Sequence, residues 1–401
     1  MQVTDGEKRR AKLLALVALN AVPLVGVVGF GWSLVALLLI YWVELGVRLA
    51  FAALEGLFAE RKPDYDAAGF SWLVVGAFSE KRGGVSLPVL PLSVQLANLP
   101  TVAVTLVIGG LAWLLFGGIG VGGVDAATDA PMGDTATTTA GFGILAVTLG
   151  RAVEAGGYFL DREYESVSAQ EPLRDALLSV AGIGSALFVG GLFVASGAPG
   201  PFVLVAVFCV KLLADVVDVY RDRLEAYDER TSPDLGLAYE PLEWEPVDTT
   251  FDGEAETVRP NRLAVLVDGI VRGARSPAAL LLATPLTLFG LLTLATDGGA
   301  SIATVGVAAA VLFGTFAAFG TVDRLVRYLC MEYRVDDDVV GYDRLFGPQW
   351  RLPGEEFADV ERARTLTDRL FGTETVVVER DEGRVRLPHL PSHAVAAVFD
   401  T

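Results

Sequence analysis

The stretch that decides the fold is residues 33–58, SLVALLLIYWVELGVRLAFAALEGLF. It is long and apolar enough for a membrane helix, because about 20 residues cross the hydrocarbon core of a bilayer. It nevertheless contains Glu44 and Arg48, whose four-residue spacing places both charges on one helix face. A charge near the bilayer centre costs about 2.5 to 3.5 kcal/mol. We therefore expect this face to point into a helix bundle or a wet cavity.

The same pattern recurs in two later apolar runs, with Arg151 and Glu154 in one and Lys211 and Asp215 in the other. With charges nearer the ends of the runs, these residues predict an intramembrane charged network. Such a network can lock helices together or carry protons and ions, and residues near the inner surface can reach the interface. The predicted members are Glu44, Arg48, Arg151, Glu154, Lys211, Asp215, Asp218, Asp323 and Arg324.

The composition is that of a membrane protein with acidic aqueous parts. Hydrophobic residues make up 52% of the 401 residues and occur in long blocks. Asp and Glu number 49 against 31 Lys and Arg, which gives a formal net charge of −18. Such acidity is typical of halophilic archaeal proteins, because molar salt screens the self-repulsion. It argues against nucleic-acid binding.

Eight apolar runs are long enough to cross a bilayer, which predicts an α-helical polytopic membrane protein. Basic residues flank the N-terminus and the loops on one side, whereas the turns on the other side contain no Lys or Arg. By the positive-inside rule we expect both termini to be cytoplasmic, with the protein in the cell (plasma) membrane. The predicted helices lie near residues 12–30, 33–57, 97–118, 139–160, 176–197, 201–220, 276–296 and 302–327.

The pattern divides the chain into a cytoplasmic tail at 1–11, a transmembrane domain at 12–330 and a cytoplasmic domain at 331–401. Within the transmembrane domain, residues 221–275 are predicted to be an acidic cytoplasmic linker. After residue 330, short segments of alternating apolar and polar residues are separated by turn residues. This pattern predicts a small antiparallel β-sheet followed by a short helix.

No catalytic constellation is evident in the sequence. His389 and His393 are the only histidines, and Pro391 between them disfavours a helical metal-binding pair. Cys209 and Cys330, the only cysteines, belong to apolar runs, so neither a disulfide framework nor a thiolate metal site is expected. No phosphate-binding loop, dinucleotide fingerprint or zinc-protease motif occurs. We therefore expect no enzymatic activity, no cofactor and no bound metal.

Three short motifs stand out in the first part of the chain. They are Tyr41-Trp42-x-Glu44, Glu60-Arg61 and Lys211-x-x-x-Asp215. They resemble the multi-pass membrane family known as domain of unknown function 6498, over most of residues 12–220. The chain departs from that pattern where Arg151 and Glu154 replace an expected His and small polar residues. The resemblance implies an integral membrane protein and no specific role.

The tail has a second set of motifs, in the order expected for alternating strands and turns. They are Glu332-Tyr333-Arg334-Val335, Trp350-Arg351-Leu352-Pro353, Arg369-Leu370-Phe371-Gly372-Thr373 and Val385-Arg386-Leu387-Pro388. This order resembles a bacterial pleckstrin-homology-like domain over about 70 residues, and the resemblance implies a protein or lipid contact module beside the membrane. Because acidic residues outnumber arginines in the tail, we expect protein contact or self-association.

These observations predict a non-enzymatic membrane scaffold or assembly protein. Its expected partners are the lipid bilayer and, through the C-terminal domain, another protein or a second copy of the chain. The alternative is a transporter or channel that moves protons, ions or a small solute along the charged face. Neutral replacement of Glu44 separates the two, because a lock loses stability whereas a transporter loses flux.

Overall fold

The computed structural model describes residues 14, 17, 21, 25–63, 76–88, 91–127, 133–228, 230, 242–251, 253–295, 299–354, 360–380 and 383–399. The chain divides into two compact units. We call Met1–Asp64 with Thr101–Glu243 the bundle unit, and Tyr65–Pro100 with Trp244–Thr401 the sheet unit. The predicted tail at 1–11 lies outside the described residues.

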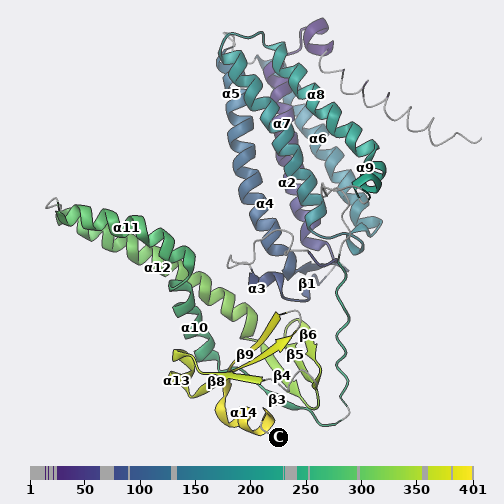
Figure 1. Ribbon diagram of the computed structural model, residues 1–401. Helices are drawn as coiled ribbons and strands as arrows, with labels where there is room; N and C mark the ends of the chain where they lie inside the picture. The colour runs from purple at the N-terminus through teal and green to yellow at the C-terminus, as the bar shows by residue number, and fades with distance from the viewer. Residues whose placement is uncertain are drawn as a thin grey trace, which may run out of the picture. The chain divides into compact units, whose positions relative to one another are not determined.

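The bundle unit is built from long apolar helices, with α7 in contact with α2, α5 and α8 (Figure 1). The chain from α4 through η2 to α5 is one continuous helix whose middle segment, η2, is π-helical. The elements are α2 (Leu34–Phe58), α4 (Leu99–Ala112), η2 (Trp113–Gly117), α5 (Gly118–Ala126), α6 (Asp134–Leu160), η3 (Glu163–Glu165), α7 (Gln170–Ala195), α8 (Pro201–Val219) and α9 (Arg221–Asp228).

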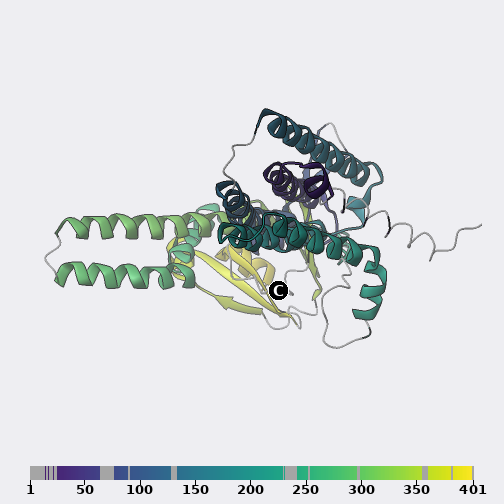
Figure 2. The ribbon, with the colours of Figure 1, turned by 90° about the horizontal axis from the view of Figure 1, so that it is seen from above.

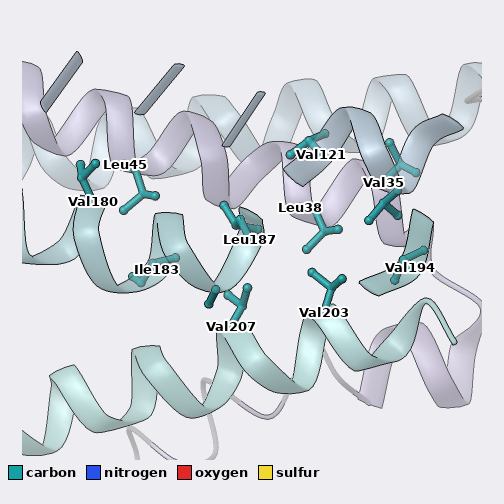
Figure 3. Packing of buried hydrophobic residues seen from close by; sticks show 12 residues of the cluster. Val35, Leu38, Leu45, Val121, Val180, Ile183, Leu187, Val194, Val203 and Val207 are labelled. Atoms are coloured by element: carbon teal, nitrogen blue, oxygen red, sulfur yellow. The ribbon is translucent and has the colours of Figure 1, made fainter. Parts of the chain in front are cut away.

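Branched aliphatic side chains fill the centre of the bundle unit. Leu38 of α2 and Leu187 of α7 are fully buried, and Val203 and Val207 of α8 close the cluster from the other side (Figure 3). These positions recur at three- and four-residue intervals, so each helix turns one apolar stripe inward. Helix α2 starts at Ser33, whose side chain accepts a hydrogen bond from the Ala36 backbone N–H at 3.3 Å.

Among the described residues, five helices are long and apolar enough to cross a membrane: Leu34–Phe58, Leu96–Ala126, Asp134–Leu160, Gln170–Ala195 and Ala303–Tyr328. A sixth span would be the pair Arg262–Ala274 and Pro277–Leu292, which is bent by 45°. The expected total of eight is therefore not reached within the described residues. In the predicted run at 201–220, Phe202–Ala214 is a shorter apolar helix, and most of the run at 12–30 lies outside the described part.

The described part of the sheet unit contains three antiparallel sheets. One is the hairpin β1 (Gly84–Ser86) with β2 (Ser93–Gln95). The second has the order β3-β4-β5-β6, formed by Glu256–Val258, Met331–Val335, Val339–Asp343 and Gly347–Leu352. The third has the order β7-β8-β9, formed by Val360–Ala363, Thr373–Arg380 and Gly383–Pro391.

Helices complete the sheet unit. They are α3 (Gly76–Ser79), η1 (Leu96–Asn98), α10 (Arg262–Ala274), α11 (Pro277–Ala295), α12 (Gly299–Tyr328), α13 (Leu366–Phe371) and α14 (Ser392–Phe399). Figures 1 and 2 both show α11 and α12 side by side as a hairpin. The strands enclose one core, in which Tyr333, Leu352, Val376 and Leu387 are fully buried.

The division of the chain differs from the predicted one in two respects. The predicted linker at 221–275 contains α9, β3 and α10, of which β3 pairs with β4 and α10 packs on α12. The α11–α12 hairpin groups with the C-terminal strands rather than with the other long helices. The physical reason is burial: Val258 of β3 and Ala264 of α10 are almost completely buried, so this part of the chain cannot be a solvated linker.

Candidate functional site

The carboxylate of Glu44 joins three helices of the bundle unit. Lys211 Nζ of α8 lies 3.2 Å from both Glu44 Oε1 and Glu44 Oε2. Arg151 Nη2 of α6 lies 4.0 Å from Glu44 Oε1, and Arg151 Nη1 lies 2.5 Å from Glu154 Oε2. Four of the predicted residues thus meet in one group, which contains two carboxylates and two cations and has no formal net charge.

The surroundings of this group are only partly polar. Lys211 Nζ also lies 5.1 Å from the centroid of the Tyr41 ring, close enough for a cation–π contact. The side chains of Glu44 and Lys211 are 19% and 24% exposed, whereas Glu154 is 65% exposed. The centre of the group is therefore enclosed by protein, and Glu154 is at its edge.

The remaining predicted residues do not all join this group. Arg48 lies one turn further along α2 than Glu44. The side chains of Asp215 and Asp218 lie outside the described part of α8. Asp323 and Arg324 belong to α12 of the sheet unit. Among the described side chains, the predicted residues are thus divided between the two units.

Two tryptophans brace the bundle beside the charged group. Trp42 Nε1 donates to the Trp113 carbonyl at 3.0 Å, and Trp113 Nε1 donates to the Trp42 carbonyl at 2.7 Å. The rings stack with centroids 5.2 Å apart. A Cβ on Gly117 would lie 2.0 Å from the Trp42 ring, and one on Gly46 would lie 2.8 Å from the Trp113 ring. Each indole thus occupies space that a glycine of the opposite helix leaves open.

A pocket of about 250 Å³ lies beside this pair. Its lining includes Val35, Leu39 and Trp42 of α2, and it extends to Asp125 near the end of α5. The pocket is mainly apolar, with Asp125 as its charged residue. Its α2 residues recur at four- and three-residue intervals, so the pocket lies on the face of α2 that is opposite Glu44.

The second group is a series of ionisable side chains that contact one another in the sheet unit. His389, only 2% exposed, has Nδ1 at 2.6 Å from Asp368 Oδ1 of α13 and Nε2 at 3.6 Å from Asp268 Oδ2 of α10. Asp268 Oδ2 also lies 2.8 Å from Arg272 Nε and 3.1 Å from Arg324 Nε. We call this series of contacts, from Asp368 through His389 and Asp268 to Arg272 and Arg324, the relay. Arg324 was predicted as a site residue, and the other four were not.

Only the Asp268–Arg272 pair of this relay could have been recognised from its spacing in the sequence. Asp268 and Arg272 are four residues apart in a helical stretch, which is the same spacing that identified the other charged pairs. His389 gave no such signal, because it lies at the end of β9 with a φ of 57° and reaches its partners only through the tertiary fold. Among the described residues, no group of three or more His, Cys, Asp or Glu side chains is arranged to hold a metal ion.

Another ion pair, which was not predicted from the sequence, holds the segment before β1 against the β3-β4-β5-β6 sheet. Lys81 Nζ lies 2.5 Å from Asp343 Oδ2 and donates to the Arg327 carbonyl at 3.2 Å. Both side chains are nearly inaccessible, at 5% and 1% exposure. Burial lowers the pKa of Lys81, while the hydrogen bond to Asp343 opposes that shift. A buried pair of this kind holds its segments in one register because either charge alone would be costly to bury.

Several carboxyl groups of the sheet unit, among them Asp338, Asp368 and Glu374, have pKa values below their usual range. Burial alone would raise the pKa of Asp368, but the hydrogen bonds that its carboxylate accepts, from Thr365 and others, outweigh burial. A hydrogen bond from Arg364 lowers the pKa of Glu374, and one from Arg351 lowers the pKa of Asp338. These groups are therefore ionised in the folded state at lower pH than in the unfolded chain.

Lowering the pH from 7 to 3 is expected to destabilise the sheet unit. Because each folded pKa lies below its unfolded value of about 3.9 to 4.3, the unfolded state binds more protons. The stabilisation is complete above the unfolded values and is lost as the pH falls through the folded ones. Hydrogen-exchange protection factors of the β8 amides, corrected for intrinsic exchange rates, should be constant from pH 7 to 5 and smaller at pH 3. Unchanged or larger protection at pH 3 would contradict this.

Comparison with known proteins identifies one family. A family model described as a family of unknown function, DUF6498, matches residues 2–232. The match includes α2 and the helices up to α9, and it stops before β3. No curated protein and no solved structure matches the chain.

Proposed function

The chain belongs to the DUF6498 family, whose function is unknown, and from this premise we propose that it is a multi-pass protein of the cell membrane with a non-enzymatic scaffold or assembly role. The observation that carries the proposal is the position of Glu44. Its carboxylate is held by Lys211 of α8 and faces Arg151 of α6, so that one acid ties two neighbouring helices to α2. Charges paired between helices in this way are expected to hold a bundle together.

The C-terminal strands support the second half of the proposal. Sheets of four and three antiparallel strands are followed by α14, which is the order that the pleckstrin-homology-like resemblance implies. We place this region and both chain termini in the cytoplasm. We propose that the region contacts a protein partner or a second copy of the chain. The acidic surface fits a halophilic archaeal cell, where high salt screens it.

The alternative function is transport of protons, ions or a small solute. In this case the Glu44 carboxylate would exchange its cationic partners during a transport cycle. A carboxylate shared by two cations from different helices is a chemically reasonable place for such an exchange.

A double-mutant cycle with Glu44→Gln and Lys211→Gln tests the proposal. Each single replacement leaves an uncompensated charge, so we expect each to lower the free energy of unfolding by about 2 kcal/mol, with a coupling of about 1 to 3 kcal/mol in the double variant. Unfolding in detergent by titration with a denaturing surfactant provides the measurement. Additive losses would contradict the interhelical tie.

The same variants separate the scaffold from the transporter. In vesicles that contain a pH-sensitive dye or a tracer ion, the scaffold predicts no flux through the wild-type protein. Flux in the wild type that disappears in a folded Glu44→Gln variant would support transport instead. Leu160→Gln, at a residue 85% exposed at the end of α6, is the control for a neutral polar change that touches no ion pair.

A further inference from the structure

Helix α10 exposes its largest apolar side chains. Leu263, Leu266 and Ile270 recur at three- and four-residue spacing on one face and are 63%, 37% and 44% exposed. Ala264 and Val265, on the other side of the helix, are completely buried. Among the described residues of the sheet unit, no protein contact covers the leucine-bearing face.

The charged side chains of α10 also differ in exposure: the carboxylate is buried and arginines are exposed. Its only carboxylate, Asp268, is 5% exposed and is neutralised by Arg272 and Arg324. Arg262 at its first residue and Arg275 just after its last are exposed. The accessible charges of the helix are therefore all positive, in a chain with a formal net charge of −18.

Helix α13, which contacts α10, repeats this arrangement independently. Its single acid, Asp368, is fully buried, whereas Arg369 is exposed. Leu366 and Leu370, four residues apart, are 68% and 72% exposed. Figure 1 shows α10 and α13 as neighbouring helices. Both bury their aspartate and expose leucine and arginine. We call these exposed leucines, Ile270 and the three arginines the α10–α13 face.

The chain connects this face to the most apolar part of the sheet unit. After Ala274, α11 begins at Pro277 and contains no charged residue, and the two helices meet at 45°. α10 also packs closely on α12, since a Cβ on Gly269 would lie 2.7 Å from Thr321 Cα. Thr321 is near the end of Ala303–Tyr328, a helix long enough to cross a bilayer. If that helix spans the membrane, α10 begins where the span ends.

We infer that the α10–α13 face binds the surface of the bilayer, with its leucines among the upper acyl chains and its arginines on the phosphates of anionic lipids. An apolar stripe flanked by arginines is the composition of interfacial helices, and anionic headgroups attract such residues electrostatically. The inference rests on the membrane placement of the proposed function but not on the scaffold role. It would hold the sheet unit in a fixed orientation on the membrane.

The test uses the full chain with Cys209 and Cys330 replaced by alanine and one new cysteine that bears an environment-sensitive fluorophore. The informative sites are Leu266→Cys and Leu370→Cys. Val311→Cys, at a position 63% exposed in α12, reports the acyl-chain region, and Asp337→Cys, in the exposed β4–β5 turn, reports water. Each variant is reconstituted into phosphatidylglycerol or phosphatidylcholine vesicles and quenched by aqueous iodide or by brominated acyl chains.

We expect the probes at 266 and 370 to be quenched by brominated lipid and protected from iodide, more strongly in phosphatidylglycerol. Replacing Arg262, Arg275 and Arg369 by Gln should weaken docking about fivefold per arginine, from about 1 kcal/mol for each basic residue at such a surface. Arg386→Gln, an exposed arginine of β9 outside this face, should change nothing.

Two results would overturn the inference while leaving the membrane placement intact. One is iodide quenching at 266 and 370 equal to that at 337, with lipid quenching at 311. The other is protection of 266 and 370 from both quenchers, which would mean that protein covers the face. Absence of lipid quenching at 311 would instead overturn the membrane placement, and this inference with it.

Discussion

Replacing Asp368 by alanine is expected to destabilise the sheet unit by about 4 kcal/mol, in the range found for breaking buried charged networks. The carboxylate accepts hydrogen bonds from the Thr365 backbone N–H at 3.0 Å and from the hydroxyls of Thr365, Thr373 and Thr375 at 2.8 to 3.0 Å. His389 Nδ1 also lies within hydrogen-bonding distance of Asp368 Oδ1, at 2.6 Å. Alanine would leave these donors buried without an acceptor, which is the costly way to lose a hydrogen bond.

The measurement is the loss of hydrogen-exchange protection in β8 and β9, whose residues surround the carboxylate. Asp368→Asn, which keeps one acceptor oxygen, should cost about half as much, because neutral hydrogen bonds are weaker than charged ones. Asp337→Ala, at an exposed turn residue, is the matched control and should change stability by less than about 0.5 kcal/mol. A loss below about 1 kcal/mol for Asp368→Ala would show that the relay does not stabilise the sheet unit.

Replacing Gly120 by alanine is expected to destabilise the bundle unit by about 3 kcal/mol, at the upper end of typical overpacking costs. A Cβ at this position would lie 2.4 Å from the Leu187 carbonyl oxygen of α7. In return, a Cβ on Gly191 of α7 would lie 2.4 Å from the Gly120 carbonyl oxygen. The two backbones are in direct contact, as small residues permit in membrane helices, so no side-chain rotation can relieve the clash.

Gly122→Ala is the matched control, because a Cβ there meets nothing within 4 Å. It lies on the same helix, two residues away, and should be neutral or stabilising by up to about 1 kcal/mol from helix propensity. The free energy of unfolding in mixed detergent measures both variants. If Gly120→Ala and Gly122→Ala are equally stable, the contact between α5 and α7 is not the one described. Gly191→Ala should add little to Gly120→Ala, because either one already separates the helices.

Much of the architecture could be predicted from the residues. Long apolar runs predict α2, α6 and α7 close to their observed bounds, since an uninterrupted apolar stretch has no alternative to a long helix. Alternation with turn residues likewise predicts the strands after residue 330, including the pairing of β4 with β5 across Asp336–Asp338. The predictions were less accurate for short elements. β3 has three residues, and its pairing with β4 depends on contacts far along the chain.

The ion pairs of Glu44 show the same limit of prediction from the sequence. The spacing of Glu44 and Arg48 correctly places both on one helix, but Glu44 makes its ion pairs with Lys211 and Arg151 of other helices. A sequence period specifies which face a residue is on. It carries no information about which neighbouring helix that face meets.

What the sequence by itself determined is therefore the presence of several long apolar helices, the strand pattern of the tail and the presence of charges that must be neutralised. The tertiary structure alone decided their partners: Glu44 with Lys211, and Asp268 with His389 and Asp368. The physical reason is that the cost of closing a loop grows only slowly with its length. Residues far apart in the chain can thus meet almost as readily as near ones, and close packing selects among them.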